Sequence, residues 1–223
     1  MSFEFHVDQE VLDLGIKVKG VVIEGLDNET IDEVYLSYRK EKIAELFNQY
    51  KEVRIKEDPI VEGFYQLHSK VNVRRRNNAP SVETLVRLLQ KREDLPQINK
   101  VVDLYNIIST ETKVSLGAHD IDKISGNVTL KIQDGSEKFI PLGKDEPQAI
   151  KAGEYSYIDE DHEIICHLEI RQVNKTLVDE KTKNIFIIVQ GNEVTPQNLL
   201  EDTCHQLIDT ITKYCGGKGR IIY

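Results

Sequence analysis

The sequence predicts an α+β fold in which mixed or antiparallel sheets are flanked by helices. Two strand-like segments rich in β-branched residues, residues 3–7 and 16–26, stand near the beginning of the chain. Four helix-like segments follow one another after them, and six strand-like segments come next. Because helices and strands are segregated along the chain, an α+β architecture is favoured over alternating βαβ units.

The first two helices are expected over residues 31–52 and 60–72. In each of them, apolar side chains recur at helical spacing. Asn28 or Thr30 supplies a capping side chain for the first helix, and Pro59 stands at the start of the second. These features predict two amphipathic helices directly after the N-terminal strands.

Two more helices are expected over residues 81–93 and 97–110. The second contains Asn99, Asp103 and Asn106 close together. Asn and Asp compete with the helical backbone for hydrogen bonds and are seldom buried without partners. Two interpretations are open: these side chains hold a tight junction together, or they line a polar pocket.

After Thr112 the apolar period changes to that of strands, with turn formers between the segments. An amphipathic helix over residues 197–214 and a strand over residues 219–223 follow the last of them. The six expected strands cover residues 113–121, 127–133, 137–143, 153–159, 163–172 and 184–191.

With 223 residues, the chain is long enough to bury a sizeable core in a single compact unit of two lobes. We expect residues 1–69 to form an N-terminal α/β lobe that packs on a core of residues 70–223. The polar composition of residues 70–79 indicates a surface loop at the seam between these lobes.

Composition and charge limit the classes of function. The apolar runs are too short to cross a bilayer, and the N-terminus lacks the features of a signal peptide, so a cytoplasmic protein without a membrane partner is expected. The three cysteines form no CxxC pair and are expected to be reduced. The net charge of −9 argues against indiscriminate binding to nucleic acid, DNA included, but allows a local basic patch. No metal-ligand spacing or nucleotide loop is recognised, so neither a metal nor a cofactor is expected.

Three adjacent arginines, Arg74, Arg75 and Arg76, are the strongest local basic feature. Guanidinium groups match the geometry of phosphates, so these residues are candidates for contacts with RNA phosphates. The alternative is a solvated loop that keeps the protein soluble.

Two polar clusters occur among the expected strands. His119 lies beside Asp120 and Asp122 and resembles a small acid–base or metal cluster, or else a turn that Asp120 caps. The second cluster follows an alternating strand and is compatible with a hairpin loop or with the rim of a pocket. Its members include Gln172, Thr176 and Asn184.

A spaced pattern of residues gives the chain a resemblance to a known family. The pattern is Pro96-x-x-Asn99-x-Val101-Val102-Asp103-x-x-Asn106, followed by Asp120-x-Asp122-Lys123-Ile124-x-Gly126. In this pattern, and in further matches between residues 70 and 190, the chain resembles the B3/B4 domain in the beta subunit of bacterial phenylalanyl-tRNA synthetase. Its length is similar to that of the freestanding proteins in which this domain also occurs. The resemblance implies a B3/B4-like fold.

In the synthetase, this domain removes tyrosine wrongly attached to phenylalanine tRNA, and a bound water attacks the ester. By resemblance, Asn106 matches a pocket asparagine and Tyr105 matches a threonine of the pocket wall. The pocket histidine falls on Gly117, two positions before His119, and the glutamate that binds the tyrosine hydroxyl falls on Ile188. Because a hydrogen bond to a charged group contributes about 1.5–3 kcal/mol, a pocket with isoleucine there is not expected to prefer tyrosine.

The leading hypothesis is an RNA-binding protein whose partner is tRNA or aminoacyl-tRNA. A trans-acting aminoacyl-tRNA deacylase activity is left open, and the chain is not expected to be a complete synthetase. The alternatives are a module that binds a free amino acid or small metabolite without RNA or catalysis, and a protein-interaction scaffold with a vestigial pocket. The substrate-pocket residues expected from the sequence are Tyr105, Asn106, His119, Gln172, Thr176 and Asn184, with Arg74, Arg75 and Arg76 on phosphates.

Overall fold

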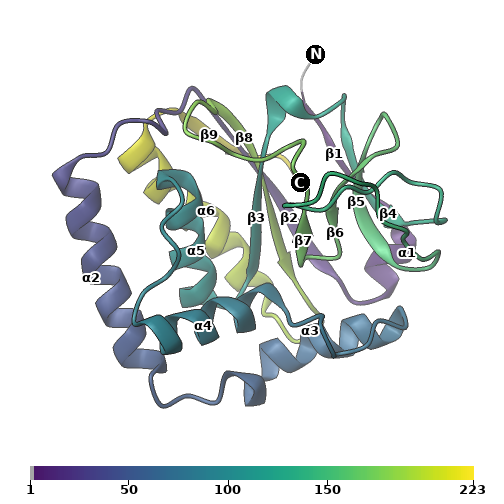
Figure 1. The fold of residues 1–223 in the computed structure, drawn as a ribbon, viewed down its shortest axis with the longest axis horizontal. Helices are drawn as coiled ribbons and strands as arrows, with labels where there is room; N and C mark the ends of the chain where they lie inside the picture. The colour runs from purple at the N-terminus through teal and green to yellow at the C-terminus, as the bar shows by residue number, and fades with distance from the viewer. Residues whose placement is uncertain (1–2) are drawn as a thin grey trace.

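Two sheets lie side by side, with the long helices gathered on one side of them (Figure 1). The computed structural model describes residues 3–223. Across the first sheet the order is β1 (Phe5–Val7), β4 (Val128–Ile132), β5 (Tyr155–Asp159), β6 (Ile164–His167) and β7 (Arg171–Gln172). Across the second it is β3 (Ser115–Asp120), β8 (Asn184–Gly191), β2 (Lys17–Glu24) and β9 (Lys218–Ile221).

The predicted α+β class with mixed and antiparallel sheets is confirmed. Strand β1 runs parallel to β4, and the other pairings between these strands are antiparallel. The α-helices are α1 (Gln9–Asp13), α2 (Glu33–Tyr50), α3 (Pro59–Lys70), α4 (Ser81–Arg92), α5 (Lys100–Thr112) and α6 (Gln197–Cys215). Two 3₁₀ turns, η1 (Ile55–Glu57) and η2 (Ile121–Lys123), complete the described elements. Among residues 3–223, no helix combines the length and the apolar character that crossing a membrane requires.

Two helices begin later than the sequence predicted. Helix α2 is capped by Asp32, whose carboxylate accepts a hydrogen bond from the Tyr35 N–H at 2.8 Å, and not by Asn28 or Thr30. Helix α5 begins at Lys100, because the Asn99 side chain accepts a hydrogen bond from the Val102 N–H at 3.0 Å. Capping by these polar side chains fixes both helix starts.

Two predicted strands differ in the structure. Residues 137–143 form no regular strand and make only isolated bridges at Lys138 and Pro141, since proline cannot donate to a ladder. Residues 163–172 divide into β6 and β7 around Leu168, which has a φ of 53°. The short helix α1, absent from the prediction, occupies the break between the first two strands.

Strand β8 separates the two main apolar cores. Its Ile185, Ile187 and Val189 pack in the core under α5 and α6, whereas Phe186 and Ile188 pack in the core between the sheets. This alternation is what a strand covered on both faces requires.

The N-terminal segment contributes to both sheets. Strand β1 pairs with β4, and β2 lies between β8 and β9. The predicted division into lobes at residues 1–69 and 70–223 stays a prediction, and Met1 and Ser2 of the first lobe lie outside the described residues.

Candidate functional site

A cavity of about 610 Å³, called the main cavity below, opens where the two sheets meet α4 and α5. Small-molecule pockets usually have volumes of about 300–1,000 Å³, so the main cavity has the size of a ligand site. Of the residues expected in a substrate pocket, Tyr105, Asn106 and Gln172 line it. Gly117 and Ile188 also line it, at the two positions where the resemblance places synthetase pocket residues.

The polar residues of α5 divide into two roles. Asn99 caps the helix, and Asp103 accepts hydrogen bonds from the Tyr35 hydroxyl at 2.8 Å and from Arg39 Nε at 3.1 Å. Both are therefore structural. Asn106, one turn further along, lines the main cavity, and its side-chain amide has no hydrogen-bond partner among residues 3–223. Of the two interpretations of this cluster, the junction applies to the first two residues and the pocket to the third.

The floor of the main cavity comes from two paired strands. Gly117 of β3 lies opposite Ile188 of β8, and a Cβ placed on Gly117 would stand only 2.9 Å from Nε2 of Gln172. The Gln172 amide thus covers the glycine. Burial raises the pKa of the neighbouring Tyr105 to about 12, with a hydrogen bond to Gln172 acting in the opposite direction, so the phenol stays protonated near neutral pH.

The structure places three sequence-predicted pocket residues outside the lining of the main cavity. His119 lies on the same strand face as Gly117, but two residues further, opposite Phe186. There its Nδ1 lies 2.8 Å from the Thr176 hydroxyl, and the two side chains are buried together. Burial lowers the pKa of His119 to about 3, so its ring is neutral. Asn184 donates a hydrogen bond to Asp122 at 3.0 Å, beside the turn η2.

The cluster of His119, Asp120 and Asp122 is resolved as a turn. The Asp120 carboxylate accepts a hydrogen bond from the Asp122 N–H at 3.1 Å and another from the Thr182 hydroxyl at 2.8 Å. Of the two interpretations drawn from the sequence, the cap applies.

Several cavity residues escaped the sequence reasoning. The hydroxyls of Ser81 and Ser115 lie 2.7 Å apart at the cavity wall, although a serine at the start of a helix is usually taken as a cap. Cys166, Glu169 and Arg171 also line the cavity. No local pattern identifies them, because they come from the β6–β7 hairpin, which meets α4 only in the folded chain.

Within the described part of the chain, Glu169 is the one acidic residue in the lining of the main cavity, and its carboxylate is bound by buried side chains beneath the cavity. Its carboxylate lies 2.7 Å from Nε2 of His68 and accepts a hydrogen bond from the Tyr155 hydroxyl. Burial alone would raise its pKa, but these two partners outweigh that effect and lower it, so the group is a carboxylate. With Gln190, which contacts Tyr155 at 3.3 Å, these side chains form a buried polar network beneath the cavity.

The three predicted phosphate contacts do not share one environment. Arg75 is paired with the Glu62 carboxylate, and its guanidinium lies 4.6 Å from the centre of the Tyr65 ring. Arg74 and Arg76, on either side of it, line a second cavity of about 530 Å³.

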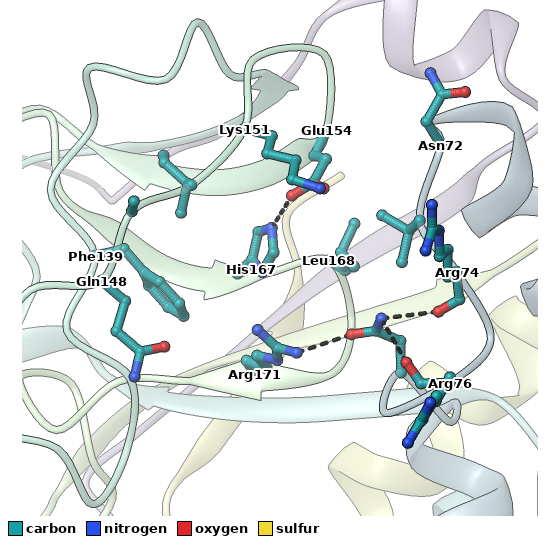
Figure 2. A pocket seen from close by; sticks show the side chains of 14 residues that line it. Asn72, Arg74, Arg76, Phe139, Gln148, Lys151, Glu154, His167, Leu168 and Arg171 are labelled. Carbon is teal, nitrogen blue, oxygen red and sulfur yellow. Dashed lines mark hydrogen bonds and ion pairs between the residues drawn. The ribbon is translucent and has the colours of Figure 1, made fainter.

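This second cavity, called the basic cavity below, adjoins the main cavity, because Gln148 and Arg171 line both. Figure 2 shows Arg171 near its centre, with Lys151 and the His167–Glu154 pair on the far side. Nε2 of His167 lies 2.8 Å from the Glu154 carboxylate. The basic cavity thus combines cationic side chains with one carboxylate that is already paired.

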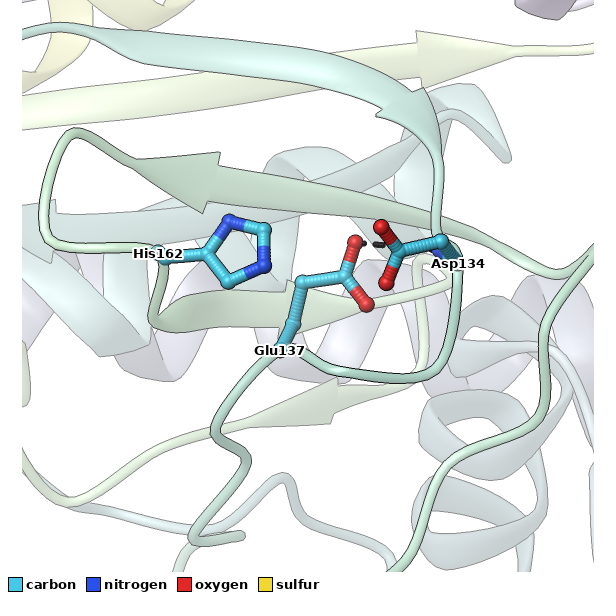
Figure 3. A group of neighbouring side chains, drawn as sticks. All are labelled: Asp134, Glu137 and His162. Atoms are coloured by element: carbon cyan, nitrogen blue, oxygen red, sulfur yellow. Dashed lines mark hydrogen bonds between the residues drawn. The ribbon is translucent and has the colours of Figure 1, made fainter.

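A cluster with metal-ligand atoms lies away from both cavities. The side chains of Asp134, Glu137 and His162 bring candidate ligand atoms within 4.8 Å of one another (Figure 3). The Glu137 carboxylate, however, accepts hydrogen bonds from the N–H groups of residues 134 and 135 at 3.1 and 3.0 Å. These contacts explain the cluster as the closure of a turn.

Comparison with known proteins identifies the family. The family model described as the B3/4 domain matches residues 68–216. The chain belongs to the B3/4 domain family. The resemblance seen in the sequence is thereby confirmed, and both cavities lie inside the matched region.

This chain is similar to parts of much longer proteins. It is 32% identical over 126 residues to the phenylalanine–tRNA ligase beta subunit of Fusobacterium nucleatum, which covers 56% of this chain and 15% of that protein. It is 34% identical over 97 residues to the same subunit of Mycoplasma pneumoniae, covering 44% of this chain and 12% of that protein. The matches therefore span a small part of those relatives.

The fold is also similar to that of a solved structure. An N-terminal fragment of the phenylalanyl-tRNA synthetase beta subunit from Pyrococcus horikoshii superposes with a TM-score of 0.55 and 18% identity. The superposition covers 99% of this chain and 51% of that fragment. At this identity the likeness concerns the fold alone.

Proposed function

We propose that the B3/4 domain of this chain binds the 3′ end of an aminoacyl-tRNA and holds the aminoacyl group in the main cavity. The observation that carries this proposal is the free amide of Asn106 beside the apolar side chain of Ile188 in one cavity of ligand size. The relatives named as phenylalanine–tRNA ligase beta subunits support an aminoacyl-tRNA over an unrelated small molecule.

An aminoacyl ester has features that this lining can recognise. Its carbonyl oxygen accepts hydrogen bonds, and the side-chain amides of Asn106 and Gln172 carry N–H donors. Its α-ammonium donates hydrogen bonds, and the side-chain oxygens of Asn106 and Gln172 can accept them. Its side chain finds apolar surface at Leu85 and Ile188. The main cavity thus offers a complement for each part of the ester.

The preferred amino acid is expected to have an apolar side chain. At position 188, where the resemblance places a glutamate, the side chain is an isoleucine that cannot accept a hydrogen bond, and it is buried. A tyrosine hydroxyl placed against it would lose its hydrogen bonds to water without replacement, which costs about 1–3 kcal/mol. Phenylalanine and aliphatic amino acids incur no such loss.

Within this proposal, the cavity hydrolyses the ester with water as the nucleophile. The water oxygen attacks the carbonyl carbon, the bond from that carbon to the ribose oxygen breaks, and a proton from water passes to the ribose oxygen. The products are a free amino acid and tRNA with a 3′-terminal hydroxyl. The role of Asn106 is to donate a hydrogen bond to the carbonyl oxygen as it gains negative charge.

A cysteine nucleophile is disfavoured by the environment of Cys166. Burial raises the pKa of this thiol far above its ordinary value, and Sγ donates to the Leu168 carbonyl at 3.3 Å. Thiolates, and not thiols, are the nucleophilic form. Water is therefore kept as the nucleophile of this proposal.

The experiment is a deacylation assay with a panel of tRNAs charged with phenylalanine, tyrosine, leucine and isoleucine. We expect release of an apolar amino acid, and a loss of about 100-fold in the Asn106→Ala variant, the usual effect of removing one donor to a developing oxyanion. Asn184→Ala is the matched control, because this amide lies outside the main cavity, and it should retain the rate. If no tRNA of the panel loses its amino acid faster than in buffer alone, the hydrolytic step of the proposal is wrong.

A direct binding measurement tests a second candidate function, a module that binds a free amino acid or small metabolite. If a free amino acid binds the protein, and neither uncharged nor charged tRNA binds it, the chain is a metabolite-binding module. The net charge of −9 is the observation that favours this second candidate.

A further inference from the structure

We propose that the basic cavity is a nucleotide-phosphate site, which holds the phosphodiester that precedes the terminal aminoacyl nucleotide. The inference rests on the proposed function for its ligand, single-stranded RNA ending in the aminoacyl group. It assigns a second binding site, with its own residues, beside the cavity that takes the ester.

The cations of the basic cavity are free to bind an anion. Arg74, Arg76 and Lys151 are exposed, and none has a carboxylate within 4.0 Å among residues 3–223. The one carboxylate of the lining, Glu154, is already paired with His167 at 2.8 Å. On a chain with a net charge of −9, three cations without partners at one cavity are a local excess of positive charge. A phosphate suits such a group of side chains, because guanidinium groups match its geometry with charge-assisted hydrogen bonds.

One asparagine holds the backbone of the loop that carries Arg74 and Arg76. The Asn78 amide nitrogen donates to the Arg74 carbonyl at 2.8 Å and to the Arg76 carbonyl at 3.3 Å, and its Oδ1 accepts from Arg171 Nη2 at 2.8 Å. Arg171 belongs to β7, so this one side chain ties the arginine loop to the sheet. A site built on a fixed frame loses less entropy when the ligand binds.

Arg75 provides a contrast within the same loop. Its guanidinium is engaged by the Glu62 carboxylate and by the Tyr65 ring, and it does not line the basic cavity. If the three arginines only kept the loop soluble, all three would be expected to have the same environment. The structure separates them into two that line the basic cavity and one that is paired with Glu62 outside it.

The two cavities are contiguous, and this favours a ligand with several nucleotides. Gln148 and Arg171 line both cavities, so an RNA strand can place its ester in the main cavity and an adjoining phosphate in the basic cavity. A free mononucleotide shares the phosphate chemistry but can occupy only one of the two at a time.

The test measures binding of a 5′-phosphorylated CCA trinucleotide to the full chain by titration calorimetry. Because the probe contains no ester, its binding does not depend on hydrolysis. We expect Arg74→Ala, Arg76→Ala and Lys151→Ala each to weaken binding by roughly fivefold to tenfold, the loss of one exposed charge-assisted contact. Arg75→Ala is the matched control and should bind within about twofold of the wild type. Each cavity variant should also lower the slope of log affinity against log salt by about 0.7, the value for one phosphate of a single strand.

Titration with AMP identifies the source of the phosphate. Weaker binding of AMP than of the trinucleotide, with the same dependence on Arg74 and Arg76, supports the RNA end. Equal binding of both probes supports a nucleotide-phosphate site that needs one nucleotide only. If the three cavity variants bind both probes as the wild type does, or if Arg75→Ala weakens binding as much as they do, the inference is overturned. Loss of deacylation with intact trinucleotide binding would contradict the hydrolytic proposal and leave this site standing.

Discussion

The side-chain amide of Gln172 lies over Gly117, so that a Cβ at position 117 would stand 2.9 Å from Nε2 of Gln172. The two residues come from different sheets, β7 and β3, and meet only in the floor of the main cavity. Any side chain at position 117 and the glutamine therefore compete for one space. This competition explains how a glycine can stand at a position where the resemblance places a histidine.

The contact between Gly117 and Gln172 predicts a non-additive pair of variants. Gly117→Ala should displace the glutamine and slow deacylation severalfold, and Gln172→Ala should do so directly. In the double variant the alanine at 117 meets open space, so its cost should largely disappear, with a coupling energy of about 0.5–3 kcal/mol. A double-mutant cycle on the deacylation rate measures this coupling. Effects that simply add would show that the amide does not act from its position over the glycine.

The buried carboxylate of Asp103 predicts a large effect on stability. Its side chain is 2% exposed and contacts both Tyr35 and Arg39. Asp103→Ala leaves Arg39 without its buried partner, and the free energy of unfolding should fall by about 3–5 kcal/mol. Asp94→Ala is the control: it contacts Arg39 at 3.0 Å, but is 51% exposed, and its removal should cost less than about 1 kcal/mol. Urea denaturation of the two variants tests this order, and equal losses would refute it.

The neutral, buried ring of His119 predicts how stability depends on pH. The pKa of this residue is about 3 in the folded chain and about 6.5 when unfolded, so between these values the unfolded chain binds the additional proton. Its contribution to stability is therefore complete above pH 6.5 and decreases as the pH falls towards 3, by about 1.4 kcal/mol per unit. Between pH 7 and pH 5, the free energy of unfolding should fall by about 2 kcal/mol more in the wild type than in the His119→Gln variant. Denaturation at the two pH values measures this difference. The exposed His205 gives the control His205→Gln, whose pH dependence should match that of the wild type. An unchanged slope in His119→Gln would contradict the assignment.

The apolar floor predicts a change of substrate preference. Ile188→Glu introduces an acceptor where the resemblance places one, and it should raise the deacylation of tyrosyl-tRNA relative to phenylalanyl-tRNA by about 10- to 100-fold, since a charged acceptor contributes about 1.5–3 kcal/mol. Ile188→Gln is the matched neutral variant and should give a smaller change. Rates with both tRNAs, measured for each variant, give the ratio. A ratio that stays at the wild-type value would remove Ile188 from the specificity argument.

Local patterns in the sequence predicted most of the elements, because strand alternation and helical spacing are properties of short segments. The pairing of β1 with β4, more than a hundred residues apart, has no such local cause. Nor could spacing show that 137–143 lacks a ladder, since Pro141 and the turn at Glu137 interrupt it.

In the candidate site, too, local patterns pointed to some residues and missed others that only the folded chain brings together. Asn106 could be predicted at a pocket because asparagine is disfavoured inside a helix and because the family pattern includes it, and it lines the main cavity. The sequence could not show that His119 lies outside the lining of the main cavity, because alternation gives the face of a strand but not what covers that face, and Thr176 covers it here. Lys151 and Arg171 were missed because their proximity to Arg74 arises only when the β5–β7 region packs against the arginine loop.

The central claim is that the main cavity binds an aminoacyl group at Asn106. A crystal structure with an aminoacyl-adenosine analogue, in which an amide replaces the ester and resists hydrolysis, tests it most directly. We predict that the phenylalanyl analogue binds with its carbonyl oxygen within hydrogen-bond distance of the Asn106 amide and its ring against Ile188. An analogue bound elsewhere on the protein, with the main cavity occupied by water alone, would contradict the claim.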